Sequence, residues 1–190
     1  MIYQFLSKMP QFDETVFVAP SADIIGDVVI GAESSVWFNV TIRADVNWIR
    51  IGSRTNIQDN CSIHVMNQTG PTWIGDEVTI GHNAMIHGCQ IKDRVLIGIQ
   101  ATVLDKAVIE SDVIVAANSL VPPGKRLESG YLYMGSPVKQ VRKLTDDEIA
   151  GIRKYSENYI RYKRTYMQVD KYDTNPFYDE NKRPEDWSGY

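Results

Sequence analysis

The sequence has little of what marks several common classes of protein. Its 190 residues contain only two cysteines, Cys61 and Cys89, too few for a disulfide framework and not spaced like a redox pair or a zinc ribbon. No apolar run approaches the roughly 20 residues that span a bilayer, and the N-terminus lacks the features of a signal peptide. The formal net charge of −4 shows no basic excess, which argues against a nucleic-acid partner. We therefore expect one main body, reduced thiols, a cytoplasmic location and no membrane partner.

What the sequence does contain is an aliphatic residue at intervals of six over about 100 residues. These residues are Val18, Ile24, Ile30, Val36, Ile42, Ile51, Ile57, Ile63, Ile74, Ile80, Ile86, Ile91, Ile97, Val103, Ile109, Val115 and Val121. Neither the helical period of 3.6 nor the strand period of 2 explains this spacing. A parallel β-helix does, because each hexapeptide forms one short strand and a corner, and three of them close a triangular coil. The alternative, a sandwich of short strands, would show turn signals every 8–12 residues.

Two details refine this predicted coil. Glycine often follows the aliphatic residue directly, where a tight corner would favour it; the examples are Gly31, Gly52, Gly75, Gly81 and Gly98. The rhythm is interrupted between Ile42 and Ile51, and again between Ile63 and Ile74. We expect the inserted residues, 43–50 and 65–73, to loop out of the coil.

The C-terminal part of the chain follows a different pattern. After the last aliphatic repeat comes a connection rich in proline and glycine. Thr145 and Glu148 then form a capping box, and the apolar spacing beyond them predicts a helix to about residue 167. We expect a β-helix domain over 1–130, the connection and helix over 131–168, and a tail without regular structure over 169–190.

The three histidines of the chain fall close together in the repeat. His64 directly follows Ile63, and His87 directly follows Ile86. Because these two isoleucines should stack on adjacent coils, the two histidines should point outward from one face about 4.8 Å apart. His82 lies two positions after the aliphatic residue of the neighbouring face and should therefore sit round a corner from the pair.

This arrangement predicts a metal site that one chain cannot complete. Three imidazoles with one position left for water are typical of zinc, and iron or cobalt would fit similar geometry. If coils pack side by side, His82 of a neighbour completes the set, and the arrangement closes as a homotrimer. The same register places Arg43 in the column of the histidine pair and Asp59 beneath His82. We expect Arg43 to face Asp59 across the subunit boundary.

Several motifs resemble the signature of gamma-class carbonic anhydrases and their close relatives. They are R-A-D at 43–45, N-I-Q-D-N at 56–60, I-H at 63–64 and I-G-H-N-A-M-I-H-G-C at 80–89. The likeness covers roughly residues 10–165. It implies a left-handed parallel β-helix with a C-terminal helix, assembled as a homotrimer. It also implies zinc between subunits, held by His64 and His87 of one chain and His82 of another, which would hydrate carbon dioxide to bicarbonate through hydroxide formed on the metal.

The same resemblance assigns roles to further residues. Arg43, Asp45 and Asp59 would hold the subunit interface and shape the site. Gln58 would orient the zinc-bound solvent, since an amide donates or accepts without taking up the proton; its alternative is a hydrogen bond at a corner. Tyr159 on the terminal helix is a further candidate for the site, and its alternative is packing.

The sequence departs from the most active members of that family where they carry proton-exporting glutamates. The 64–73 loop has no carboxylate, and Val46 follows the R-A-D motif. Two other functions therefore stay open. One is a hexapeptide-repeat acyltransferase or thioesterase acting on acyl-CoA, which would use a histidine as base and need no metal. The other is a metal-binding homologue with little anhydrase activity.

Overall fold

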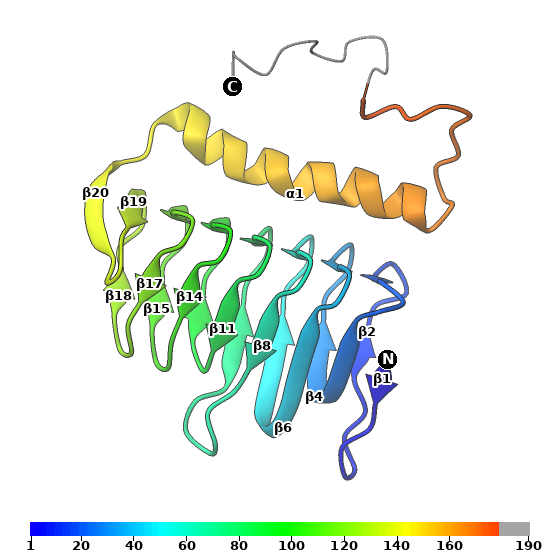
Figure 1. Ribbon diagram of the computed structural model, residues 1–190, viewed down its shortest axis with the longest axis horizontal. Helices are drawn as coiled ribbons and strands as arrows, with labels where there is room; N and C mark the ends of the chain where they lie inside the picture. Colours follow the sequence, from blue (N-terminus) through cyan, green and yellow to red (C-terminus); the bar gives the residue numbers. More distant parts are fainter. Residues whose placement is uncertain (179–190) are drawn as a thin grey trace.

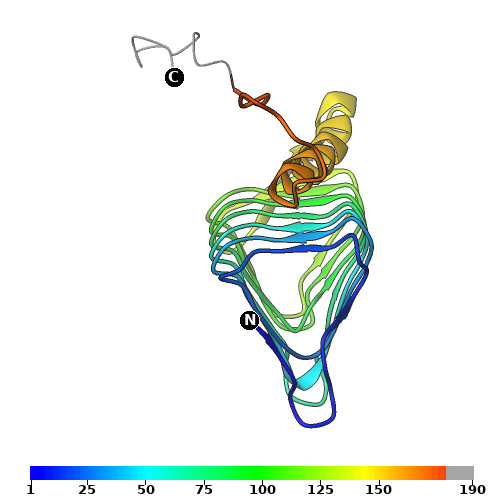
Figure 2. The same cartoon turned by 90° about the vertical axis from the view of Figure 1, so that its right-hand side faces the viewer.

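The chain folds into a β-solenoid of about seven triangular coils with one helix lying along its side (Figure 1). The computed structural model describes residues 1–178. Viewed along the solenoid axis, successive coils stack in register (Figure 2). The parallel β-helix predicted from the six-residue period is therefore confirmed.

Two sheets make up the three faces of the triangle. The helix face is an eight-stranded sheet of β3 (Phe17–Val18), β5 (Ser35–Val36), β7 (Asn56–Ile57), β10 (Thr79–Ile80), β13 (Val95–Ile97), β16 (Val113–Val115), β19 (Tyr131–Met134) and β20 (Lys139–Lys143). The other two faces share a 12-stranded sheet of β1 (Ile2–Tyr3), β2 (Gln11–Phe12), β4 (Asp23–Ile30), β6 (Thr41–Ile51), β8 (Ser62–His64), β9 (Thr72–Ile74), β11 (Met85–His87), β12 (Gln90–Ile91), β14 (Thr102–Val103), β15 (Val108–Ile109), β17 (Leu120–Val121) and β18 (Arg126–Leu127). Strands β8, β11, β14 and β17 form what we call the histidine face, and β9, β12, β15 and β18 the tryptophan face.

The core is a set of aliphatic ladders inside the coil. On the histidine face, Ile42, Ile63, Ile86 and Val103 are successive register partners, and each side chain is at most 1% exposed. Burying one such side chain stabilises the fold by about 1.5–3 kcal/mol. The ladders continue beyond the last predicted repeat through Leu127 and Tyr133, both of which are buried.

The corner glycines have a different cause from the one predicted. The left-handed backbone lies two residues later, as at Arg54 (φ 57) and Glu77 (φ 57). A Cβ on Gly52 would instead lie 2.2 Å from Asp76 Oδ1 and 2.6 Å from the carbonyl carbon of Gly75. Glycine is needed at this position because successive coils approach too closely for a side chain.

This close approach predicts the effect of adding one methyl group. Gly52→Ala should destabilise the fold by about 1–3 kcal/mol, the usual cost of overpacking. Gly151→Ala is the matched control, because its Cβ on the helix meets nothing within 4 Å, and it should stabilise the protein by up to about 1 kcal/mol. Urea denaturation at one chain concentration measures both, and equal shifts in the same direction would contradict the steric explanation.

The two interruptions of the repeat take different forms. Of the predicted loop, residues 65–71 leave the coil and are closed by a bridge between Met66 and Gly70, whereas residues 72 and 73 belong to β9. The prediction that residues 43–50 loop out is wrong, because they remain within β6. Residues 43, 44, 49 and 50 pair with β4, and the register shift between Gly26 and Val28 leaves residues 45–48 without partners in β4. Both strands pass round the corner and join the histidine and tryptophan faces into one sheet.

The predicted terminal helix is α1 (Asp146–Tyr166), capped by Thr145 and Glu148 as a capping box. It packs against β5 and β10 on the helix face. The buried ammonium of Lys163 lies 2.9 Å from a carboxylate oxygen of Glu33 and anchors the helix to an early coil. No helix among residues 1–178 is long and apolar enough to cross a membrane.

The first part of the predicted tail is irregular and returns to the helix. The ring of Phe177 packs edge-on against Tyr162, with 4.9 Å between centroids, and Arg161 lies over the same ring. Residues 179–190, which the predicted tail also includes, lie outside the described residues.

Candidate metal centre

Two imidazole nitrogens converge on the histidine face. His64 on β8 and His87 on β11 are register partners, as the repeat predicted. Nδ1 of His64 lies 3.1 Å from Nε2 of His87. Two nitrogens this far apart, each about 2.0–2.1 Å from one zinc ion, would subtend an angle of roughly 100° at the ion, close to tetrahedral. The pair therefore fits two positions of a zinc site.

Carboxylates hold the other nitrogen of each ring. Nε2 of His64 lies 3.0 Å from Asp45 Oδ1, and Nδ1 of His87 lies 2.6 Å from Asp105 Oδ1. Asp45 also accepts a hydrogen bond from Arg43. Burial opposes ionisation of Asp45, but the hydrogen bonds from His64 and Arg43 outweigh it and hold the pKa of this carboxyl below its ordinary value. Such partners are typical of histidines that bind metal, because they orient the ring and raise its basicity.

His82 lies on the turn between β10 and β11, round a corner from the pair, as the sequence predicted. Its Nδ1 lies 3.0 Å from Asp59 Oδ2, on the corresponding turn one coil earlier. Each of the three histidines thus has one ring nitrogen within hydrogen-bond distance of a carboxylate oxygen. Within residues 1–178 of a single chain, no three His, Cys, Asp or Glu side chains are grouped to hold a metal ion.

A hollow of about 360 Å³ lies beside His82, between the helix face and α1. Gln58 and Tyr159 both line it, so both of these predicted residues lie next to the third histidine. The amide of Gln58 donates to Asn56 Oδ1 at 3.2 Å, which is the kind of local hydrogen bond that we gave as its alternative role. Tyr159 also packs edge-on against Trp37, with ring centroids 5.3 Å apart.

The hydroxyl of Tyr159 is a poor acid in this position. Burial, together with the nearby negative charge of Asp59, raises its pKa to about 12. The group therefore stays protonated at neutral pH, so it is able to donate a hydrogen bond but not to act as a base.

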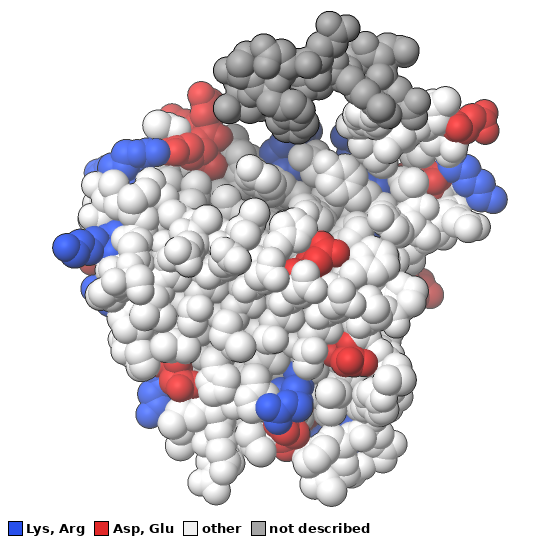
Figure 3. Space-filling view, in the orientation of Figure 1, with Lys and Arg blue, Asp and Glu red and all other residues white. Residues whose placement is uncertain are grey.

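The outward side chains of the histidine face carry few charges. Figure 3 shows this side of the molecule as a broad uncharged surface with scattered acidic and basic groups. Beyond the histidine pair the outward positions are occupied by Met85, Thr102, Leu104, Leu120 and Pro122. Met85 is 40% exposed although it is apolar. A surface of this kind is typical of one covered by another protein chain.

Comparison with known proteins indicates the family to which this chain belongs. The mitochondrial gamma carbonic anhydrase 2 of Arabidopsis thaliana is 51% identical over 158 residues, which are 80% of this chain and 57% of that relative. A probable carbonic anhydrase of Methanocaldococcus jannaschii is 45% identical over 159 residues, which cover 84% of this chain and 98% of the relative. The chain belongs to the gamma carbonic anhydrase-like hexapeptide-repeat family. No protein-family model matches it.

A solved structure supports the same family membership. The crystal structure of a hexapeptide transferase family protein from Anaplasma phagocytophilum is 41% identical, with a TM-score of 0.84 over 87% of this chain and 97% of that one. The chain spans little more than half the length of its plant relative, 57%.

Sequence reasoning missed one residue of this gamma carbonic anhydrase-like site, Asp105. A signal for it was present, since Asp105 lies two positions after Val103, and Val103 stacks on Ile86. An aspartate on the coil above His87 could therefore have been considered as its partner. The family resemblance did not point to it.

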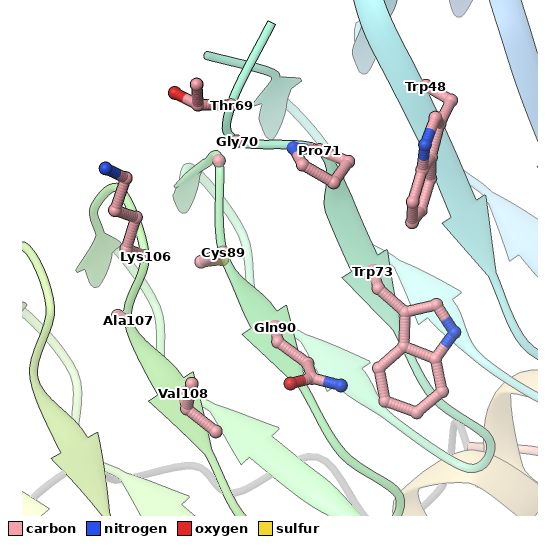
Figure 4. Close-up of a pocket in the computed structure, with 11 residues that line it drawn as sticks. Trp48, Thr69, Gly70, Pro71, Trp73, Cys89, Gln90, Lys106, Ala107 and Val108 are labelled. Atoms are coloured by element: carbon pink, nitrogen blue, oxygen red, sulfur yellow. The ribbon is translucent and has the colours of Figure 1, made fainter.

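A second hollow of about 430 Å³ lies on the tryptophan face (Figure 4). Trp48 and Trp73 stand at its edge, with Arg50 over the first ring at 5.2 Å and Lys92 over the second at 5.7 Å. Cys89 also lines it, so the hollow lies beyond the corner that follows His87 and is separate from the histidine pair.

Both cysteines are structural in this member of the family. Cys61 and Cys89 are free and buried. Burial raises the pKa of each thiol to about 12, so both stay protonated and unreactive at neutral pH. The prediction of plain reduced thiols agrees with this arrangement.

Proposed function

We propose that this protein is a zinc-dependent carbonic anhydrase of the gamma type, which hydrates carbon dioxide to bicarbonate. The observation that carries the proposal is the approach of His64 Nδ1 to His87 Nε2 at 3.1 Å, with a carboxylate on the other nitrogen of each ring. The names of the relatives from Arabidopsis thaliana and Methanocaldococcus jannaschii support the same reaction.

The proposed enzyme is a homotrimer of left-handed coils. Two histidines of one chain leave the ligand set one short, and His82 of a neighbouring copy would complete it in a closed ring of three. The sparsely charged histidine face supports its burial against another copy. In that assembly Arg43 would face Asp59 across the boundary, in addition to the hydrogen bond that it makes to Asp45 within its own chain.

In the proposed site, His64, His87 and a neighbour's His82 hold the metal. Zinc, when bound, activates water for attack on carbon dioxide at neutral pH; iron or cobalt would suit the same donors. Gln58 orients solvent beside His82 through its amide. Tyr159 stays protonated and donates a hydrogen bond at the edge of the site.

Removal of the proton from the site should be slow in the proposed enzyme. The 65–71 loop contains no carboxylate, and Val46, which is 43% exposed, stands directly after Asp45. No acidic side chain is therefore offered in the two places where the most active relatives would carry one. The proton has to leave through solvent or buffer, so we expect the rate to depend on buffer concentration.

Metal content and hydration together test the proposal. Protein purified without added metal should contain about one zinc per chain, and chelation should abolish carbon dioxide hydration until zinc returns. At fixed pH, raising the imidazole buffer concentration should raise the rate towards a plateau. If zinc-loaded protein hydrates carbon dioxide no faster than a metal-free sample, the anhydrase proposal fails. The protein would then be the metal-binding homologue with little anhydrase activity.

Acyl transfer is the second candidate function. The relative from Anaplasma phagocytophilum is described as a hexapeptide transferase family protein, and a structure from Bacillus cereus, 37% identical with a TM-score of 0.86, as a putative acetyltransferase. Such an enzyme would use a histidine as base without a metal. A metal-free sample that turns over acyl-CoA would favour this reading over the anhydrase.

A further inference from the structure

We infer that Asp105 is a positioning residue for the metal site, which holds His87 in the one tautomer that directs Nε2 at His64. The consequence of this role, tight metal binding, rests on the proposed function. The hydrogen bond between His87 and Asp105 lies within a single chain and does not require the metal.

The hydrogen bond fixes which nitrogen of His87 carries the proton. An ionised carboxylate only accepts hydrogen bonds, so Nδ1 of His87 must donate to Asp105 Oδ1 across the 2.6 Å between them. In the neutral ring Nε2 is then left with its lone pair, and it is this atom that lies 3.1 Å from Nδ1 of His64. Only a nitrogen with a free lone pair can bind a metal ion.

The backbone beside His87 makes room for this carboxylate. A Cβ on Gly88 would lie 2.4 Å from Asp105 Oδ1, and the φ of Gly88 is +54, in the left-handed region that favours glycine. The carbonyl of Gly88 also accepts a hydrogen bond from the backbone N–H of Lys106 at 2.7 Å. The two turns that carry His87 and Asp105 are therefore tied together by the backbone.

Two aspartates at the same place in the corners between the tryptophan face and the helix face are used differently. Asp93, like Asp105, lies two positions after an inward aliphatic residue, but its Oδ1 accepts from the backbone N–H of Asp76 at 2.9 Å. Asp76 in turn accepts from the backbone N–H of Ser53 at 2.7 Å. These carboxylates link coils, whereas the carboxylate of Asp105 lies on an imidazole. Asp93→Asn is therefore a matched control.

The substitution that tests the inference is Asp105→Asn. An amide can accept from Nδ1–H or donate to a bare Nδ1, so it keeps the shape but no longer selects a tautomer. Loss of such a partner typically weakens metal binding by about 10–100-fold. Competition with a chromophoric chelator should show a loss of this size for Asp105→Asn and less than about threefold for Asp93→Asn.

A second readout does not depend on the metal. Nitrogen-15 NMR of the metal-free protein at pH 8 should show the Nδ1–H tautomer of His87 in the wild type and a mixture of tautomers in Asp105→Asn. Gly88→Ala, which displaces the carboxylate without removing it, should lose zinc affinity in the same way. Circular dichroism checks that each variant is folded.

The outcomes separate the inference from the proposed function. If Asp105→Asn is folded and keeps both wild-type zinc affinity and the Nδ1–H tautomer, the inference is overturned while the anhydrase proposal stands. If the wild type binds no zinc, the proposed function fails. The tautomer of His87 in the metal-free wild type and variant still decides whether Asp105 positions the ring.

Discussion

Co-expression of two inactive variants, His82→Ala and His87→Ala, should restore about a quarter of the wild-type zinc sites and of carbon dioxide hydration. In the proposed ring, each site takes its pair of histidines from one chain and the third from the next. When the variants mix equally, each of these two conditions is met with a probability of one half, so about one site in four is intact. Each variant alone should lose at least about a hundredfold in zinc affinity, since loss of an outer partner already costs 10–100-fold.

The matched control is a mixture of His64→Ala with His87→Ala. Both substitutions remove a ligand from the same half of the site, so no combination of these chains rebuilds an intact pair. Two different affinity tags on the chains allow mixed trimers to be isolated, and zinc is measured in them; each mixed trimer of His82→Ala with His87→Ala should then hold about one intact site in three, and the control none. Equal zinc recovery in both mixtures, or none in either, would contradict a site shared between subunits as the face count assigns it.

Ile24→Ala should destabilise the fold by about 2–5 kcal/mol, whereas Ile25→Ala at the next position should cost less than about 1 kcal/mol. Both residues lie in β4, but Ile24 is fully buried in the ladder that continues through Ile42, and Ile25 points outward and is partly exposed. The first substitution opens a cavity inside the coil. The second removes a methyl-rich side chain from a surface.

Urea denaturation of the two variants and the wild type, at one fixed chain concentration, measures this difference. The comparison has the same chemical change at adjacent positions, so helix or strand propensity contributes equally to both. If Ile25→Ala destabilises the fold as much as Ile24→Ala, the six-residue period does not mark the inward-facing side chains of β4.

The six-residue period was sufficient to predict the ladders and the histidine pair. Because three hexapeptides close each coil, the position of a residue relative to the inward aliphatic side chain determines its face. This is why the count placed His64 over His87 and put His82 round the corner. The capping box at Thr145 likewise marked where α1 begins, since its hydrogen bonds are local.

Other features depend on the distances between successive coils, which the six-residue spacing along the sequence does not determine. Residues 43–50 remain within β6 because β4 pairs with both ends of this segment, at residues 43–44 and 49–50, which the pattern of one strand cannot show. The need for glycine at position 52 comes from the coil above it. Asp105 reaches His87 because Gly88 leaves space for its carboxylate. Each of these contacts joins residues about one coil apart in sequence.

The last strand of the helix face bears on the solubility of the solenoid. Parallel coils end in an open edge, which is a template for a further chain to add on. Here β20 (Lys139–Lys143) folds back antiparallel on β19, and all five of its residues are exposed. Three of them, Lys139, Arg142 and Lys143, are basic. A second solenoid approaching this end would meet positive charge on an antiparallel strand, so end-to-end polymerisation into fibres is opposed where the coil stops.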